Sequence, residues 1–262
     1  MNYTLPFLPE RESKPRNRGI AMVMDKGLSV EEAKNLVSAA GHLIDYIKLG
    51  FGTSIATNSL REKINLYRDS GISVYMGGTL FEAFLVRNMF DEYVDLLKKY
   101  DISTVEVSDG SISIDHQRKC DYITRLANDF HVLSEVGSKN AGVELDSSEW
   151  ISQMKTELTA GSSLVIGEAR ESGTVGIYGK DGSANTALID EIHDHVPENK
   201  ILWEAPKKAQ QAWFIRHFGP QVNLGNIAPA EIIALETLRL GLRGDTFFEF
   251  LPEDVKKEYS IR

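Results

Sequence analysis

The amino-acid sequence predicts a (β/α)8 TIM barrel, a closed sheet of eight parallel strands in which a helix follows each strand. Two patterns lead to this prediction. Short apolar segments recur along the chain at the period of a strand, a helix and two loops. These segments are continuously apolar, which is typical of parallel strands that helices cover on the outside. Eight of them are present, the number of strands that closes this barrel.

The predicted strands are spaced evenly enough to form one domain. They begin near Gly19, Tyr46, Ser73, Thr104, His131, Leu164, Ile201 and Val222, so the intervals between starts run from 21 to 37 residues. A doubly wound sheet is the alternative, but it needs a glycine-rich dinucleotide turn after its first strand. The segment MVMDKGLS at that position contains no such turn, so the barrel is preferred.

Helix signals lie between the predicted strands. Three pairs have the spacing of a capping box, namely Ser29 with Glu32, Thr79 with Glu82, and Asp146 with Glu149. They predict helices after the first, third and fifth strands. Pro206 and Pro229 stand near the predicted starts of the last two helices, where a missing N–H costs little.

The chain divides into an arm, a barrel and a tail. Residues 1–17 carry three prolines and many charges and are expected to form an N-terminal arm. Residues 18–246 are expected to form the barrel and to be the catalytic domain. Residues 247–262 form a C-terminal tail, whose Phe247, Phe248 and Phe250 we expect to pack on the barrel or on a second subunit. A homo-oligomer is therefore expected.

Composition restricts the partners. A net charge of −9 and a pI near 5.3 disfavour nucleic acid and anionic membranes, which attract basic surfaces. Cys120 is the single cysteine, which suits a reducing compartment. The sequence begins without a cationic leader and has no run of about 20 apolar residues. We therefore expect a cytoplasmic protein.

Charged and amide residues close nearly every predicted strand. They are Asp25, Lys26, Lys48, Glu106, Asp109, Glu135, Lys139, Glu168, Arg170, Glu204, Asn223 and Asn226. In a barrel the carboxyl ends of all strands share one face, where the active site lies. Ionised groups beside an apolar core cost free energy unless they are paired or bind something. The sequence thus predicts one polar site assembled from many strands.

The glutamates and lysines of this set allow two interpretations. Glu106, Glu135, Glu168 and Glu204 could simply pair with Lys48, Lys139 and Arg170. Four carboxylates on consecutive strands would nevertheless repel one another, and a divalent hard cation such as Mg²⁺ would relieve that repulsion. A lysine in such a place can act as a general acid, form an imine or bind an anion.

Three loops indicate an anionic ligand. GFGTS follows the second strand, GGT the third and LGNIAP the eighth, and each runs toward a helix whose free N–H groups favour phosphate or sulfonate. The stretch GTVGIYGKDGS lacks the spacing of a nucleotide-binding P-loop. The histidines lack metal-ligand spacing.

Several of these segments resemble the phosphosulfolactate synthase family. The stretches are RGIAMVMDKGL, DYIKLGFGTS, GGTLFE, VEVSDG, LSEVGSK, VIGEARESG, WEAPKKAQQAWFIRHFG, VNLGNIAP and LETLRLGLRGDT. The likeness runs in order from Arg18 to Thr246. Ala21, Phe51 and Lys207 depart from it, where Thr, Trp and a neutral residue would be expected.

The resemblance implies a barrel that adds sulfite to phosphoenolpyruvate with Mg²⁺ and gives 2-phospho-3-sulfolactate. In methanogens the family serves coenzyme M synthesis, and related chains occur in bacteria and as heat-stress-associated proteins in plants. By resemblance and by the chemistry, we expect a metal-stabilised enolate that Lys139 protonates.

The resulting hypothesis assigns a role to each site residue. The expected catalytic residues are Lys139, Lys48, Arg170 and Glu204. The expected substrate-binding residues are Asp25, Lys26, Gly52, Thr53, Asp109, Asn223, Gly225 and Asn226. The expected metal ligands are Glu106, Glu135 and Glu168, because successive strand ends can meet one ion. The substrates are small anions, and no nucleic acid or membrane is expected as a partner.

Two alternatives remain open at this point. An aldolase-like barrel lyase would use Lys48 or Lys139 to form an imine with a keto acid. A non-catalytic, stress-related barrel protein of the same family would use the fold for interactions alone. Formation of a product that depends on sulfite separates both from the main hypothesis.

Overall fold

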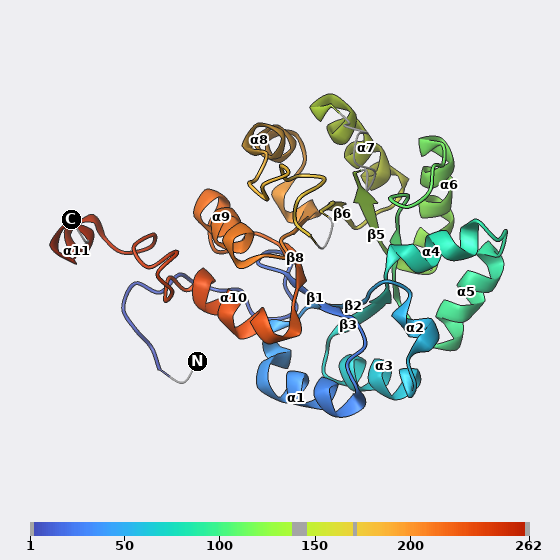
Figure 1. The fold of residues 1–262 in the computed structure, drawn as a ribbon, viewed down its shortest axis with the longest axis horizontal. Helices are drawn as coiled ribbons and strands as arrows, with labels where there is room; N and C mark the ends of the chain where they lie inside the picture. Colours follow the sequence, from blue (N-terminus) through green and yellow to red (C-terminus); the bar gives the residue numbers. More distant parts are fainter. Residues whose placement is uncertain (1–2, 138–145, 170–171, 260–262) are drawn as a thin grey trace.

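Eight parallel strands form a barrel with helices around it (Figure 1). The computed structural model describes residues 3–137, 146–169 and 172–259. The strands are β1 (Ala21–Asp25), β2 (Tyr46–Leu49), β3 (Ser73–Met76), β4 (Thr104–Val107), β5 (His131–Val136), β6 (Leu164–Gly167), β7 (Ile201–Glu204) and β8 (Leu224–Ile227). Their order is β3-β2-β1-β8-β7-β6-β5-β4, and β3 and β4 lie in contact, so the barrel is nearly closed. The predicted fold class is confirmed.

The predicted strand starts agree closely with the structure. Six of them coincide with the observed starts of β2 to β7, and β1 and β8 each begin two residues later than expected. At β1 the cause is local. Gly19 has a φ of 69°, and its N–H bonds to the carbonyl of Gln221, so the chain before Ala21 belongs to a turn.

The helices surround the sheet in sequence order (Figure 1). They are α1 (Val30–Ala40), α2 (Thr53–Ala56), α3 (Leu60–Asp69), α4 (Gly78–Leu85), α5 (Phe90–Lys99), α6 (His116–Ala127), α7 (Ser147–Ala160), α8 (Thr186–His195), α9 (Lys208–Phe218), α10 (Ile232–Arg239) and α11 (Glu253–Tyr259). Short 3₁₀ turns span Gly41–Leu43, Glu198–Lys200 and Pro229–Glu231. No helix among the described residues is long and apolar enough to cross a membrane.

Two of the three predicted capping boxes are present. Ser29 and Asp146 cap α1 and α7, and in both helices the glutamate three residues later bonds back to the cap. The box predicted at Thr79 is wrong, because α4 begins earlier with Gly77 as its N-cap. Glu82 is buried instead and accepts hydrogen bonds from the Ser108 hydroxyl at 2.5 Å and from a loop N–H. Tertiary partners have outcompeted the local cap.

Strand side chains alternate between the helices and the barrel interior. Interior residues include Met22, Tyr75, Leu133, Ile166 and Leu202, which form a separate buried apolar cluster. Glu135, Glu168 and Glu204 stand two positions after Leu133, Ile166 and Leu202 and therefore also face inward, but they are polar. This alternation decides which strand-end side chains can share one site.

The amino-terminal end of the barrel is closed by arginines. Arg239 of α10 is fully buried and donates to the carbonyls of Pro220 and Val222, both at 2.7 Å, and of Ile20 at 3.2 Å. Arg11 of the N-terminal segment pairs with Glu236 at 3.0 Å. These contacts join the segments before β1 and β8.

The C-terminal segment extends away from the ring of helices beside α10 (Figure 1). Phe250 packs against the core, whereas the side chain of Phe247 is 47% exposed. Helix α11 has no buried residue.

We expect Arg239→Met to lower the free energy of unfolding by about 3 kcal/mol, because it leaves three buried carbonyls without their charged donor. Urea denaturation of the purified variant measures this loss. Arg125→Met is the control, since Arg125 and Asp91 form an exposed pair at 3.0 Å, and its loss should cost less than about 1 kcal/mol. Equal effects of the two substitutions would contradict a closing role for Arg239.

Candidate active site

A cavity of about 630 Å³ opens at the carboxyl ends of the strands. Its polar lining comes from Lys48 on β2, Glu106 on β4, Glu135 on β5, Glu168 after β6, Glu204 on β7 and Asn226 on β8. Six of the predicted site residues thus meet in one place. The barrel brings them together because each stands at or directly beside the carboxyl end of its strand.

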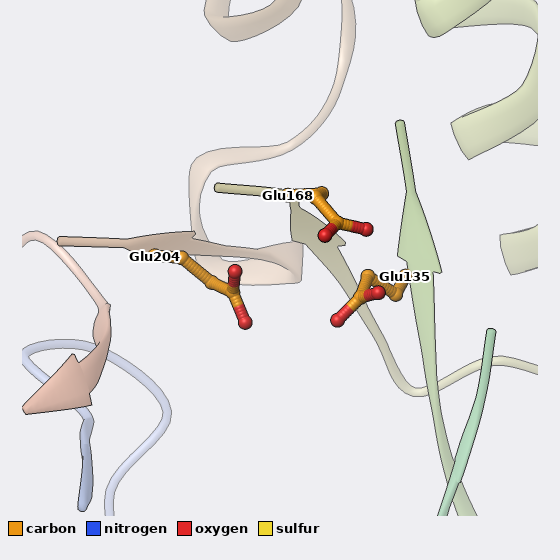
Figure 2. Close-up of side chains that lie close together, drawn as sticks. All are labelled: Glu135, Glu168 and Glu204. Atoms are coloured by element: carbon orange, nitrogen blue, oxygen red, sulfur yellow. The ribbon is translucent and has the colours of Figure 1, made fainter. Parts of the chain in front are cut away.

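Three glutamates point toward one another across this cavity (Figure 2). Glu135, Glu168 and Glu204 each offer a carboxylate oxygen, and these oxygens lie within 4.8 Å of one another. All three side chains are almost completely buried. Buried carboxylates at this separation form a donor set that suits a hard divalent cation. The residues therefore fit a metal ion.

The three carboxylates differ from the predicted metal ligands by one residue. Glu135 and Glu168 were predicted, and Glu204 takes the place expected for Glu106. Glu106 is held elsewhere: its Oε1 accepts the N–H of Gly78 at 2.6 Å, and its Oε2 lies 2.9 Å from the ammonium of Lys48. A Cβ atom at position 78 would come within 2.2 Å of the Ser108 hydroxyl and 2.8 Å of Glu106 Oε1. The close approach of this backbone to Glu106 therefore requires glycine.

Lys48 lies between carboxylates. Its Nζ is 2.9 Å from Glu106 and 3.4 Å from both Glu135 and Glu204. Burial lowers the pKa of Lys48, but the three carboxylates raise it by more, and the pKa lies well above its ordinary value. The side chain is therefore a persistent cation.

Burial also changes the acidity of the glutamates. It raises the pKa of Glu204 to about 7, although Lys48 and the N–H of Ala169, which donates at 2.8 Å, act in the opposite direction. The pKa of Glu106 is raised for the same reason, again against the effect of Lys48. The cavity thus holds carboxyl groups that ionise nearer to neutral pH than exposed ones.

A second ionic network supports the β5 side of the cavity from outside the barrel. Lys119 of α6 is fully buried and contacts the carboxylates of Asp109 at 2.9 Å and Glu157 at 2.8 Å. Its third partner is the main-chain carbonyl of Glu135 at 2.6 Å. The predicted substrate-binding residue Asp109 is thereby tied to the strand end that carries Glu135.

Other predicted substrate-binding residues lie away from the cavity lining. Asp25 points outward from β1, where it accepts two backbone N–H bonds at 2.8 Å and contacts Lys63 at 2.8 Å and Tyr67 at 2.9 Å. Lys26 is exposed in the following turn. Asn223 precedes β8, at the opposite end of the strand, and bonds to the N–H of Ile20 at 3.0 Å. These contacts fix the backbone of the barrel.

Three predicted residues lie beside residues of the cavity lining without belonging to it. Gly225 pairs with Glu204 in the sheet, and a Cβ there would come within 2.8 Å of Met22, so its role is close packing. Gly52 and Thr53 begin α2 directly after Phe51, which lines the cavity and is 52% exposed.

Asn226 lines the cavity in an unusual backbone conformation. Its φ is 57°, a left-handed value that asparagine adopts more readily than most residues. Its carboxamide oxygen is buried and has no hydrogen-bond partner in the part of the chain that the structure describes. An acceptor aimed into a cavity in this way is suited to a ligand.

Some lining residues were not predicted from the sequence. Thr79 stands in the first turn of α4, and Ser111 and Ser172 lie in loops after strands, where spacing gives no signal. Tyr75 is not part of this lining. It pairs with Lys48 in register and packs in the interior apolar cluster, where its hydroxyl is buried without a partner among the described residues. The predicted residues Lys139 and Arg170 lie outside the described residues.

A deep acidic cavity at the carboxyl ends of a (β/α)8 barrel defines a barrel enzyme that acts on small molecules. The sequence model of the (2R)-phospho-3-sulfolactate synthase (ComA) family matches residues 9–245. The phosphosulfolactate synthase of Methanothermobacter thermautotrophicus is 41% identical over 91% of this chain and 95% of its own length. That of Bacillus subtilis is 39% identical over 92% and 97%. The chain belongs to the phosphosulfolactate synthase family.

Two further comparisons concern more distant similarities. The Arabidopsis thaliana protein HEAT-STRESS-ASSOCIATED 32 is 22% identical over 88% of each chain. The crystal structure of a 3-hexulose-6-phosphate synthase superposes with a TM-score of 0.53 at 15% identity, covering 84% of this chain and 98% of that one. This likeness concerns the fold alone.

The raised pKa of Glu204 predicts a pH dependence of stability without metal. Between pH 4.5 and about 7 the folded protein keeps a proton on Glu204 that the unfolded chain has released, so stability falls as the pH rises through this window. Glu204→Gln cannot ionise. Urea denaturation in the presence of chelator measures the free energy of unfolding of both proteins. The value for the variant relative to the wild type should rise by on the order of 2 kcal/mol from pH 5 to pH 8.

Glu236→Gln provides the comparison for this measurement. Burial raises the pKa of Glu236, but Arg11 lowers it by more, so the group titrates below its ordinary range. The difference between this variant and the wild type should stay constant from pH 5 to 8. A constant difference for Glu204→Gln as well would contradict a raised pKa.

Proposed function

We propose that this protein is a phosphosulfolactate synthase that adds sulfite to phosphoenolpyruvate in the presence of Mg²⁺. The observation that carries the proposal is the identity of about two residues in five with phosphosulfolactate synthases over more than nine-tenths of the chain. The buried carboxylates in the cavity support it, because they can hold a divalent cation. Such a cation is what stabilises the negative charge that the reaction develops on small anionic substrates.

Glu135, Glu168 and Glu204 are the residues that would hold Mg²⁺. The bound ion would supply a Lewis acid for the charge that develops on the substrate carboxylate. Magnesium prefers oxygen ligands and keeps room for substrate oxygens and water, and the cavity beside the three carboxylates provides that room.

The protein's own groups have two tasks in this reaction. The sulfur lone pair of sulfite forms the new bond to C3 of phosphoenolpyruvate, and the electron pair of the C2–C3 double bond moves toward the carboxylate. Positive groups and N–H donors must hold the anions while this charge develops. We assign this task to Lys48 and Arg170, with the carboxamide of Asn226 orienting a donor group of substrate or water.

The second task is to deliver a proton to C2. We assign it to the ammonium group of Lys139, which ends the family-like stretch LSEVGSK after β5. Lysine is a general acid of suitable strength when cationic and acidic groups around it adjust its pKa.

The imine alternative is weakened at Lys48. Imine formation needs a neutral amine, whereas the carboxylates around Lys48 hold its pKa well above the ordinary value after burial has lowered it. The non-catalytic alternative has less support as well, since the stress-associated plant relative is 22% identical and the synthases are 39–41% identical.

Purified protein with phosphoenolpyruvate, sulfite and Mg²⁺ should form a phosphoester that carries one added sulfonate. Phosphorus NMR together with mass spectrometry detects this product. Omitting sulfite or adding chelator should abolish it, because the nucleophile or the Lewis acid is then missing. Product formation by metal-stripped enzyme without a divalent cation would contradict the proposed metal role, and the absence of product with folded protein would contradict the function.

Lys139→Ala should lower kcat by at least about a hundredfold, the usual scale for loss of a general acid, with a much smaller change in KM for phosphoenolpyruvate. Steady-state kinetics from the same product assay measure both constants. Lys180→Ala, another loop lysine that lies outside the cavity lining, is the matched control and should stay within about twofold of the wild type. Normal turnover by Lys139→Ala would reject the assignment.

A further inference from the structure

We propose that Lys48 is an internal counter-ion that competes with the divalent metal for Glu135 and Glu204. When no metal is bound, its ammonium group forms ion pairs with these two carboxylates. When the metal binds, the ammonium group moves away and leaves the carboxylates to the metal. The inference rests on the proposed metal role of Glu135, Glu168 and Glu204, and it concerns a property that catalysis alone does not require.

The geometry assigns the same two carboxylate groups to Lys48 and to the converging metal-binding group. Lys48 Nζ lies 3.4 Å from Oε2 of Glu135 and 3.4 Å from Oε1 of Glu204. Both residues also belong to the group of three whose oxygens converge within 4.8 Å. A metal ion on that group and an ammonium 3.4 Å from two of its members would repel each other strongly in a buried site. Both cannot keep their best contacts.

The three ion pairs of Lys48 are unequal, which indicates how the competition is resolved. The contact with Glu106 is the shortest, at 2.9 Å, and Glu106 is outside the converging group. Glu106 is itself fixed by the N–H of Gly78 at 2.6 Å. Lys48 can therefore give up Glu135 and Glu204 and remain paired with Glu106.

The surroundings of the side chain allow such a shift. Lys48 lines the cavity, although its side chain is only 8% exposed. Its Cε passes over Gly77, where a Cβ atom would come within 3.2 Å. The glycine leaves room for the alkyl chain to move. Lys48 would then lie nearer the anionic substrate and farther from the metal carboxylates.

Titration with Mn²⁺ tests the competition without relying on activity. The free ion is measured by electron paramagnetic resonance on chelator-treated protein without substrate. Lys48→Met should bind Mn²⁺ about tenfold or more tightly than the wild type, because a competing charge has been removed. Lys48→Arg keeps the charge and should bind close to the wild-type affinity. Lys208→Met, which removes an equal charge from an exposed pair with Asp245, should change the affinity by less than about twofold.

A double variant guards against loss of folding. Lys48→Met/Glu106→Gln removes one charge of each sign and should also bind Mn²⁺ more tightly than the wild type, with circular dichroism confirming the fold. Mn²⁺ binding no tighter than that of the wild type, both by folded Lys48→Met and by the folded double variant, would overturn the inference while leaving the metal site intact. If Glu168→Gln bound Mn²⁺ as tightly as the wild type does, that result would overturn the metal site itself and this inference with it.

Discussion

The concentration of buried carboxylates at one end of the barrel is the constraint on which the rest of the site depends. Four glutamates are almost completely removed from water there, and an ionised carboxylate in such a place needs a partner. The structure provides backbone N–H groups from two loops and the ammonium of Lys48. The segments after β3 and β6 therefore stabilise the carboxylates through their N–H groups. The segment after β3 has glycine at position 78, because a Cβ atom there would collide with Ser108 and Glu106.

The same principle applies outside the barrel, where helix lysines tie down strand ends. Lys119 of α6 holds Asp109 and the carbonyl of Glu135, and Lys63 of α3 holds Asp25 with the help of Tyr67. Breaking a buried pair by removing one partner is costly, whereas the pair as a whole adds little stability over apolar packing. We interpret these pairs as devices that fix where the strand ends lie, so that the inward glutamates keep their separation.

Most of the fold follows from the sequence, because the period of buried strands is set by local chemistry. Six strand starts and two capping boxes agree with the structure. The site is harder to predict. Asp25 was expected in the cavity, yet it lies two positions after outward-facing Val23, and alternation alone sends it toward α3. Which three glutamates converge depends on strand tilt and on the position of Lys48, and no spacing in the sequence contains that information.

The separation between fold and function is visible along single strands. In β5, Leu133 belongs to the apolar interior and Glu135, two residues later, belongs to the cavity. A barrel at 15% identity superposes with a TM-score of 0.53, and apolar layers in general can be built from many combinations of side chains. The second kind tolerates little change, because each buried charge there is balanced by a particular neighbour. The apolar layers therefore determine the fold, whereas the chemistry depends on the residues at the strand ends.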